Sequence, residues 1–339
     1  MGVLPDKRWH RAGTVVVAIL LLVGLAFVVA ACGVGGGVGD GGPVSSGAQT
    51  TVGQPAEPSG DATTTTEPAG SDGSGATAAT SAAPATTSAA EEPPATAAAG
   101  TSGTMTVNAY FNRDEKIAAA SRTIAKTQGA GAAAMRLLLE GPSGMETEGG
   151  MSTAIPEGTT LLALDIKNGI ATVDLSKEYA SGGGSLSMMM RLAQVVFTLT
   201  QFPTVQGVNF ALDGKAIDVL GGEGIIIDHP MTRADYEDMS PAILVESPTL
   251  GATVSSPVRV TGTANVFEAV FHVNIVDDDG LIIADDRVQA TSGTGTRGTF
   301  DVTVKYPSGH ARDGSLIVFE NSAKDGSPIN VVEIPLVLN

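Results

Sequence analysis

The chain has 339 residues, with 19 basic and 36 acidic side chains and a formal net charge of −17 at pH 7. A surface this acidic repels the phosphate backbone of nucleic acids, so it argues against binding to DNA or RNA. The chain holds a single cysteine, which excludes an intramolecular disulfide and a zinc site built from several thiolates.

Residues 1–31 have the pattern of an export signal. Three basic side chains lie between residues 7 and 11, and an uncharged apolar run follows over residues 14–31. The small residues Val29-Ala30-Ala31 close this run directly before Cys32. A basic start, an apolar middle and small residues at the end predict a signal peptide that is cleaved from the mature protein.

The tetrapeptide Val29-Ala30-Ala31-Cys32 resembles the bacterial lipobox, in which the cysteine carries a diacylglyceryl group after cleavage. The resemblance implies that Cys32 is a lipid attachment site and that the protein is anchored at the extracytoplasmic side of the cell membrane. The alternative is an uncleaved membrane helix, because an apolar run of about 18 residues is near the length that spans a bilayer. Both interpretations place the residues after Cys32 outside the cytoplasm.

Residues 32–103 are predicted to form a disordered tether. From residue 33 onward this segment is rich in Ala, Thr, Gly, Pro and Ser, and it contains no Lys, Arg, Leu, Ile, Met or aromatic residue. Such a segment buries too little apolar area to offset the conformational entropy that folding removes. A folded structure is therefore expected to begin near Thr104.

Residues 104–236 predict a small α+β domain. The expected order is a strand, a helix, two strands, a helix and two strands, at 105–111, 129–140, 161–166, 170–175, 185–197, 208–212 and 216–219. Asn168-Gly169 between two alternating apolar segments predicts a hairpin. Ser185 is predicted to cap the second helix, whose expected buried stripe is Leu186, Met189, Met190, Ala193, Val196 and Phe197. This order favours helices packed on one face of a mainly antiparallel sheet.

Residues 241–339 predict an all-β domain. Seven short strands are expected at 243–246, 258–261, 271–276, 281–288, 300–304, 316–319 and 331–337. Turn residues separate them and no helical period appears. Seven strands in about 100 residues are typical of an immunoglobulin-like sandwich.

Both predicted domains resemble known families. The stretches LLLEGP, TAIP, ATVDL, FTLTQFP and LDGK, at 137–142, 153–156, 171–175, 197–203 and 212–215, resemble the GerMN domain, which is named after a spore-germination protein. The stretches SP, SPV, VTG, VFEA, GTF, FE and SAKDG, at 247–248, 256–258, 260–262, 266–269, 298–300, 319–320 and 322–326, resemble the immunoglobulin-like domain of bacterial spore germination. The resemblance implies a lipoprotein with these domains in tandem. GerMN domains are similar to ring-building modules of envelope complexes, and neither family pattern includes catalytic residues.

Two motifs near the second predicted helix invite a chemical interpretation. Gly182-Gly183-Gly184-Ser185 before a helix could cradle a phosphate, but it lacks the lysine of a P-loop, so a flexible loop with a helix cap is favoured. Met188-Met189-Met190 could bind a soft metal or a sticky partner. At helical spacing, two of the three face the core, so ordinary packing is favoured.

Acidic and histidine residues give no clear active site. The run 277–279, with Asp285-Asp286 nearby, could bind calcium, but the twelve-residue loop pattern is missing and a solvated hairpin tip is favoured. His229, His272 and His310 are too scattered for a zinc site or a catalytic triad. Glu268 is expected to be buried in the sandwich beside a hydrogen-bonding partner.

The leading hypothesis is a membrane-anchored extracytoplasmic lipoprotein that acts as a non-enzymatic binding or assembly module of the cell envelope. The expected partners are the membrane, through the lipid on Cys32, and envelope proteins or cell-wall components. Self-association stays open, and no nucleic acid, cofactor, metal or catalytic residue is expected. The alternative is an accessory or enzyme of peptidoglycan remodelling, which needs converging carboxylates or a metal in a cleft. A solute-binding lipoprotein is disfavoured, because no two-lobed α/β pattern appears.

Overall fold

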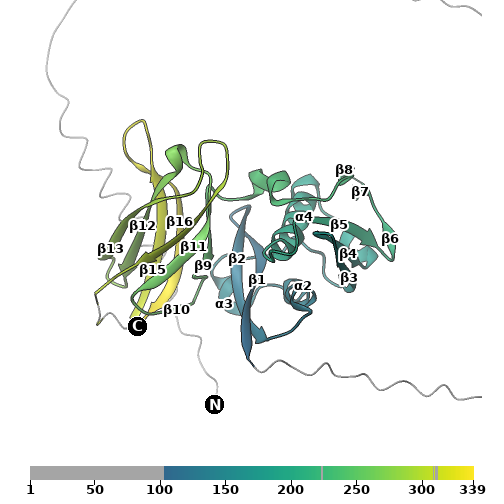
Figure 1. Ribbon diagram of the computed structural model, residues 1–339, viewed down its shortest axis with the longest axis horizontal. Coiled ribbons are helices and arrows are strands. Elements are labelled where there is room, and N and C mark those ends of the chain that lie inside the picture. Colours follow the sequence, from purple (N-terminus) through teal and green to yellow (C-terminus); the bar gives the residue numbers. More distant parts are fainter. Residues whose placement is uncertain (1–102, 223, 308, 310–311) are drawn as a thin grey trace, which may run out of the picture. The chain divides into compact units, whose positions relative to one another are not determined.

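The computed structural model describes residues 103–222, 224–307, 309 and 312–339, which belong to one compact unit (Figure 1). The predicted signal peptide, Cys32, nearly all of the predicted tether and His310 lie outside the described residues. Within the described part, no helix is long and apolar enough to cross a membrane.

A long β-hairpin opens the described chain. Strands β1 (Thr104–Arg113) and β2 (Lys116–Ala125) pair antiparallel from Thr104↔Ala125 to Arg113↔Lys116. Strand β2 is not predicted by the sequence pattern. Its alanine-rich sequence has low strand propensity, and the turn is made by Asp114 and Glu115, both with positive φ, where glycine or asparagine is usual. The α+β fold therefore begins with two paired strands, β1 and β2, where the sequence predicted only one.

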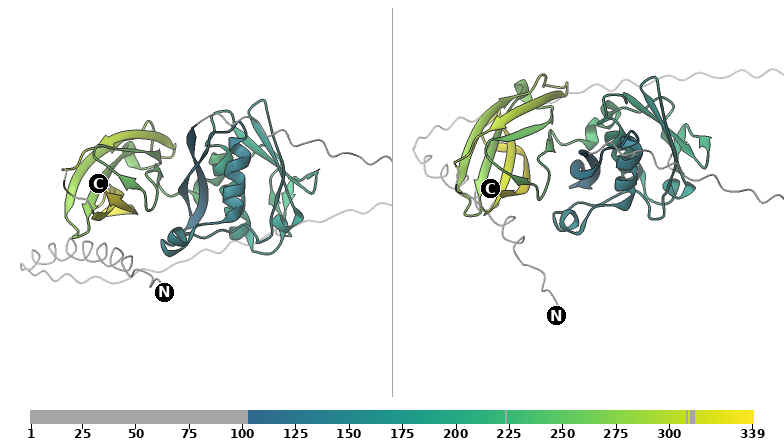
Figure 2. Two further views of the ribbon diagram at one scale, coloured as in Figure 1. Left: turned by 90° about the horizontal axis from the view of Figure 1, so that it is seen from below. Right: turned by 60° about the horizontal axis from the view of Figure 1, so that its bottom comes forward.

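Two helices, α2 and α4 (Ser185–Leu199), lie between this hairpin and a second sheet (Figure 2). Helix α2 (Ala130–Glu140) matches its prediction and ends at Gly141, which has a φ of 83°. After the short helix α3 (Gly144–Glu148), the sheet has the order β3-β4-β5-β6. Its strands are β3 (Leu161–Lys167), β4 (Ile170–Leu175), β5 (Gly207–Leu212) and β6 (Lys215–Ala216). The helices therefore have β-structure on both sides, whereas the prediction placed it on one.

The β3–β4 hairpin has Asn168 and Gly169 at its tip, both with positive φ, as predicted. Strands β4 and β5 are parallel, and helix α4 (Ser185–Leu199) makes the connection between them. A short antiparallel ribbon, β7 (Val219–Leu220) and β8 (Ile225–Ile226), follows β6. Parallel neighbouring strands such as β4 and β5 need a crossover connection like α4, because a tight turn cannot join them.

Helix α4 corrects two predictions. Gly184 is its N-cap, so Ser185 is the first helical residue rather than the cap. Leu186 is 50% exposed and does not belong to the buried stripe. From Met188 onward nearly every side chain is buried, because α4 is covered by β1 on one side and by α2 and β5 on others. Met188 and Met190 are core residues and Met189 is partly buried, so the methionines serve packing.

The rest of the chain is a β-sandwich, and all seven predicted strands are present. One sheet has the order β14-β11-β9, from Gly298–Val304, Val258–Ala264 and Ile243–Ser247. The other has the order β10-β16-β15-β12-β13, from Thr253–Val254, Pro328–Leu338, Arg312–Asn321, Val270–Asp277 and Ile282–Gln289. Phe271 and Phe300 meet edge to face between the sheets, with ring centroids 4.9 Å apart. An α+β fold followed by an immunoglobulin-like sandwich is therefore the architecture, as predicted.

Candidate functional site at the junction of the two folds

Three polar side chains meet where the α+β fold contacts the sandwich. Tyr110 comes from β1, Arg233 from the 3-10 helix η3 (Arg233–Met239), and Glu246 from β9. Arg233 Nη1 donates to Glu246 Oε1 at 2.8 Å, and Arg233 Nη2 donates to the Tyr110 hydroxyl oxygen at 3.2 Å. The Tyr110 hydroxyl in turn donates to Glu246 Oε1. We call these three residues the junction cluster.

The α+β fold holds the Arg233 guanidinium from several directions. Its Nη2 also donates to the Phe197 carbonyl oxygen at 3.3 Å, and its Nε donates to Thr200 Oγ1 at 3.0 Å. The guanidinium carbon lies 4.7 Å from the centroid of the Phe197 ring, which is a cation–π distance. Burial opposes the charge on Arg233, but Tyr110 and Glu246 outweigh that effect and raise its pKa. Burial also raises the pKa of Tyr110. The cluster is therefore a fixed ion pair that links the two folds.

Further hydrogen bonds join the same two folds. Asn108 Nδ2 donates to the Glu246 carbonyl oxygen at 3.2 Å, and the Ser121 backbone N–H donates to Thr249 Oγ1 at 3.2 Å. Strand β2 packs against β9. These contacts cover the β9 edge of the sandwich, which would otherwise present unpaired backbone groups.

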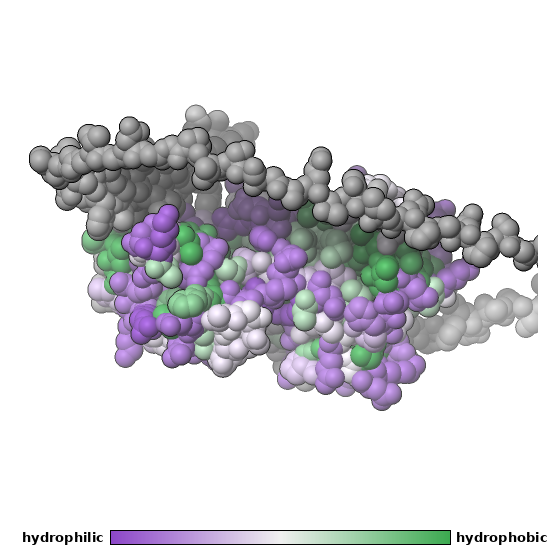
Figure 3. Space-filling view, turned by 90° about the horizontal axis from the view of Figure 1, so that it is seen from above, coloured by the Kyte–Doolittle hydropathy of each residue, from purple (hydrophilic) through white to green (hydrophobic). Residues whose placement is uncertain are grey.

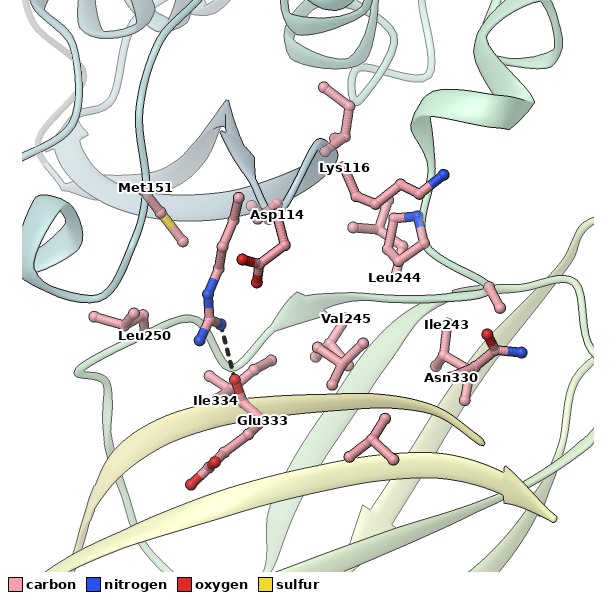
Figure 4. Close-up of a pocket in the computed structure, with 18 residues that line it drawn as sticks. Asp114, Lys116, Met151, Ile243, Leu244, Val245, Leu250, Asn330, Glu333 and Ile334 are labelled. Carbon is pink, nitrogen blue, oxygen red and sulfur yellow. Dashed lines mark hydrogen bonds between the residues drawn. The ribbon is translucent and has the colours of Figure 1, made fainter. Parts of the chain in front are cut away.

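A pocket of about 270 Å³ opens beside these contacts (Figure 4). The turn of the β1–β2 hairpin forms one wall, and β9 and β16 form the other. Apolar side chains such as Ile243, Val245 and Ile334 line it, while Arg113 and Asp114 contribute charged groups. This volume is slightly below that of ordinary small-molecule sites.

Three polar side chains of the pocket are engaged in structural contacts. Arg113 Nη1 donates to the Glu333 carbonyl oxygen at 2.8 Å, and Lys116 Nζ donates to the Asp238 carbonyl oxygen at 2.6 Å. Burial raises the pKa of Glu333, whose carboxyl group accepts a hydrogen bond from Ser315 Oγ at 2.8 Å. In Figure 4 the Glu333 carboxyl group points away from Asp114. The two carboxyl groups therefore do not converge as a catalytic acid and base would.

The glycine-rich loop before α4 binds a side chain of the protein itself. Arg191 is 2% exposed, and its guanidinium donates to the carbonyl oxygens of Tyr179, Ser181 and Gly182 at 2.6, 3.0 and 3.0 Å. Carbonyl oxygens that converge on a cation have the opposite polarity to a phosphate cradle. Arg191 is not among the residues singled out from the sequence. An arginine inside the apolar stretch of a helix nevertheless indicates that its guanidinium needs buried acceptors.

The acidic hairpin tip is also internally paired. Carboxylate oxygens of Asp277, Asp278 and Asp279 lie within 4.8 Å of one another. Arg312 Nη1 donates to Asp278 and Asp279 at 3.0 and 3.4 Å, and Asp277 Oδ1 accepts the Leu281 backbone N–H at 2.9 Å. An arginine thus offsets part of the negative charge that a cation would otherwise neutralise.

The remaining candidates do not assemble into a site. His229 contacts Asp228 and Asp235 in the α+β fold, whereas His272 contacts Asp285 and stacks on Phe319 in the sandwich. Glu268 is exposed, so its expected burial is wrong. It lies in a turn with a φ of 53° that directs its side chain outward. The buried carboxyl group of this region belongs to Glu320 instead.

The fold and the junction define a class of protein in which a small α+β domain is joined to an immunoglobulin-like sandwich. The Germane family, described as "Sporulation and spore germination", matches residues 100–218. The Gmad2 family, described as "Immunoglobulin-like domain of bacterial spore germination", matches residues 242–327. The chain thus carries a GerMN-type domain followed by a spore-germination immunoglobulin-like domain, and neither is a known enzyme family.

Three solved structures are similar in part. The first GerMN domain of the sporulation protein GerM from Bacillus subtilis is 22% identical, with a TM-score of 0.35, covering 39% of this chain and 99% of that domain. A "Putative Lipoprotein from Clostridium perfringens" is 26% identical, with a TM-score of 0.30, and the match covers 41% of this chain and 93% of that one. The tandem GerMN domains of GerM are 16% identical, with a TM-score of 0.34, covering 60% of this chain and 62% of theirs, so less than two thirds of that protein is matched. No curated protein matches the chain.

Proposed function

We propose that the protein is a lipid-anchored extracytoplasmic lipoprotein whose folded part is a non-enzymatic binding or assembly module of the cell envelope. Cys32 carries the lipid, residues 32–103 form the tether, and the domains span residues 104–236 and 241–339. Envelope proteins or cell-wall components are the partners. The lipobox pattern and the two spore-germination families support this proposal.

The observation that carries the proposal is the junction cluster. Arg233 joins Tyr110 and Glu246, and its donors have protein acceptors. A binding module benefits from such a fixed arrangement, because a rigid surface loses less conformational entropy when a partner binds. The Tyr110 hydroxyl, which donates to Glu246, is fully buried and its pKa is raised by burial, so it is poorly placed to react with a ligand. In the described part of the neighbouring pocket, the carboxyl groups of Asp114 and Glu333 do not converge (Figure 4).

Affinity capture of the full-length protein from membranes tests the proposal. Wild type is expected to retain envelope proteins after crosslinking in intact cells, and Cys32→Ala is expected to be released from the membrane fraction. Recovery of no envelope partner by wild type would contradict the binding role. Membrane retention of Cys32→Ala equal to that of wild type would contradict the lipid anchor.

Zymography separates the proposal from the cell-wall enzyme. Purified full-length protein should clear peptidoglycan no more than a sample unfolded by heat. Clearing by the folded protein alone would favour the alternative of a peptidoglycan-remodelling enzyme.

A further inference from the structure

Three loops of the sandwich lie together at one end of the domain (Figure 1). Residues of these loops line a second pocket. The loops are the segment around η4 (Phe267–Ala269), the loop over residues 290–297 and the turn over residues 322–327. The pocket has a volume of about 410 Å³. Loops held at one end of a rigid sandwich are the usual place for binding residues in immunoglobulin-like domains.

The loop-end pocket has two apolar side chains that are open to solvent among its polar lining residues. Phe267 is 57% exposed and Ile329 is 41% exposed, and both line the pocket. Figure 3 looks onto the molecule from above and shows apolar residues among hydrophilic ones on the sandwich. Exposed apolar side chains that lie together at a hollow rimmed by polar residues are typical of a binding surface.

A carboxylate lies among the lining residues of the pocket. Glu320 is 7% exposed, and its Oε2 accepts the Phe267 backbone N–H at 3.0 Å while its Oε1 accepts from Asn330 Nδ2. Within the described ranges no lysine, arginine or histidine forms an ion pair with Glu320. A buried carboxylate with neutral donors alone attracts a cation, because burial removes the water that would otherwise solvate its charge.

The backbone around the pocket is held in one conformation. Glu268 and Ala269 have positive φ values of 53° and 59°, which is uncommon for residues other than glycine. The Glu268 backbone N–H donates to Thr294 Oγ1 at 2.9 Å, and the Thr294 N–H donates to the Val266 carbonyl oxygen at 2.9 Å. The neighbouring loop thereby fixes the strained turn that presents Phe267. Such strain is typical of functional sites.

The charges on these loops favour a basic partner. Their basic residues are Arg297, which already pairs with Glu237 at 2.8 Å, and the exposed Lys324. Glu320, Glu268 and Asp325 are the acids of the same region, and the whole chain has a net charge of −17. A cationic ligand is therefore favoured both at long range and in the pocket.

We propose that this end of the sandwich binds a polypeptide through a lysine or arginine side chain flanked by apolar residues. The basic head group pairs with Glu320, and its aliphatic stem and apolar neighbours cover Phe267 and Ile329. A glycan is disfavoured, because the neutral polar side chains of the lining, Asn265, Thr294 and Asn321, already form hydrogen bonds within the protein. This inference rests on the proposed binding role and assigns that role to a surface separate from the junction.

The test uses full-length protein in detergent and two labelled peptides, acetyl-Gly-Leu-Lys-Leu-Gly-amide and the same peptide with glutamine in place of lysine. Fluorescence anisotropy should show at least about tenfold tighter binding of the lysine peptide, as expected for a charge-assisted contact. Glu320→Gln should abolish this preference. Phe267→Ala alters an exposed side chain and should not disturb folding. It should weaken the binding of both peptides. Asp286→Asn, which removes an equal charge from an exposed site on β13, should leave the preference intact.

Glu320→Gln is suited to the comparison because it preserves shape. Its oxygen can still accept the Phe267 N–H, and the Asn330 amide can turn to accept from the new amide nitrogen. Equal binding of the two peptides to wild type, or an unchanged preference in Glu320→Gln, would overturn the proposal. The proposal would also be overturned if the protein bound insoluble cell wall, Glu320→Gln abolished that binding, and wild type showed no preference between the two peptides.

Crosslinking in cells separates this inference from the broader proposal. If wild type captures an envelope partner that Glu320→Gln and Phe267→Ala lose, the loop-end site is supported. If both variants keep every partner, the site is wrong and the binding role stands. If wild type captures nothing, the binding role itself fails.

Discussion

Arg233 Nη1 lies 2.8 Å from Glu246 Oε1, and this contact joins the last segment of the α+β fold to the first strand of the sandwich. The two residues are separated by only 13 positions, yet between them the chain passes from one fold to the other. Both side chains are largely shielded from water. The short connection and the ion pair together restrict motion at this point.

Loss of the cation in the junction cluster should destabilise the protein strongly. Arg233→Ala leaves Glu246 partly buried without its cation, and breaking such a pair typically costs about 3–5 kcal/mol. Urea unfolding of full-length protein measures the change. Arg259→Ala is the matched control, because its ion pair with Asp301 is exposed to water and should contribute little to stability. Equal effects of the two variants would contradict a structural role for the cluster.

Arg191→Met should also be strongly destabilising. The change keeps an unbranched apolar stem but leaves the carbonyl oxygens of Tyr179, Ser181 and Gly182 without their donor. Each unsatisfied buried acceptor costs about 1–3 kcal/mol, so a total loss of roughly 3–5 kcal/mol is expected, some of it recovered by water. Thermal unfolding followed by circular dichroism measures it. A loss below about 1 kcal/mol would show that the loop can solvate its own carbonyl groups.

Stability should fall in acid through Glu146. Burial opposes its charge, but hydrogen bonds from Arg122 and from the Ser143 backbone outweigh burial and lower the pKa of Glu146 below its usual 4.5. A lowered pKa in the folded state stabilises the protein above pH 4.5, and this contribution disappears as the pH falls through the folded value. Urea midpoints of wild type and Glu146→Gln should therefore differ most at pH 7 and converge below pH 4.5.

The exposed residue Glu148 provides the control for this pH dependence. The urea midpoint of Glu148→Gln should equal that of wild type at every pH. If Glu146→Gln differs from wild type by the same amount at pH 3 and pH 7, the ion pair between Arg122 Nη2 and Glu146 Oε2, 2.6 Å long, does not govern acid stability.

Calcium should not stabilise the acidic hairpin tip. Arg312 already contacts Asp278 and Asp279, so a divalent ion would have to displace it and would still lack the six to eight oxygens that calcium prefers. The melting temperature of full-length protein should stay constant from zero to millimolar calcium. A rise that Asp278→Asn removes would instead identify a calcium site at this tip.

The strands of the sandwich could be predicted because each is a short apolar alternation bounded by turn residues. Strand β2 could not, because Asp114-Glu115 is an unusual pair for a turn in which both residues have positive φ. The long pairing with β1 and the contact with β9 stabilise β2 despite its alanines. The sequence places the N-cap of α4 at Ser185, one residue after the observed cap Gly184, because three successive glycines leave the start of a helix undetermined by local sequence.

The sequence by itself determined the acidic charge, the α+β and immunoglobulin-like classes and the β3–β4 hairpin, and it predicts the export signal with its lipobox cysteine. These depend on composition, local periodicity and motifs, which are properties of neighbouring residues. Only the tertiary structure decided that Tyr110, Arg233 and Glu246 meet, that Arg191 fills the glycine-rich loop, and that Glu320 rather than Glu268 is buried. Each of these depends on which distant segments pack together, and packing brings side chains together regardless of their separation in sequence.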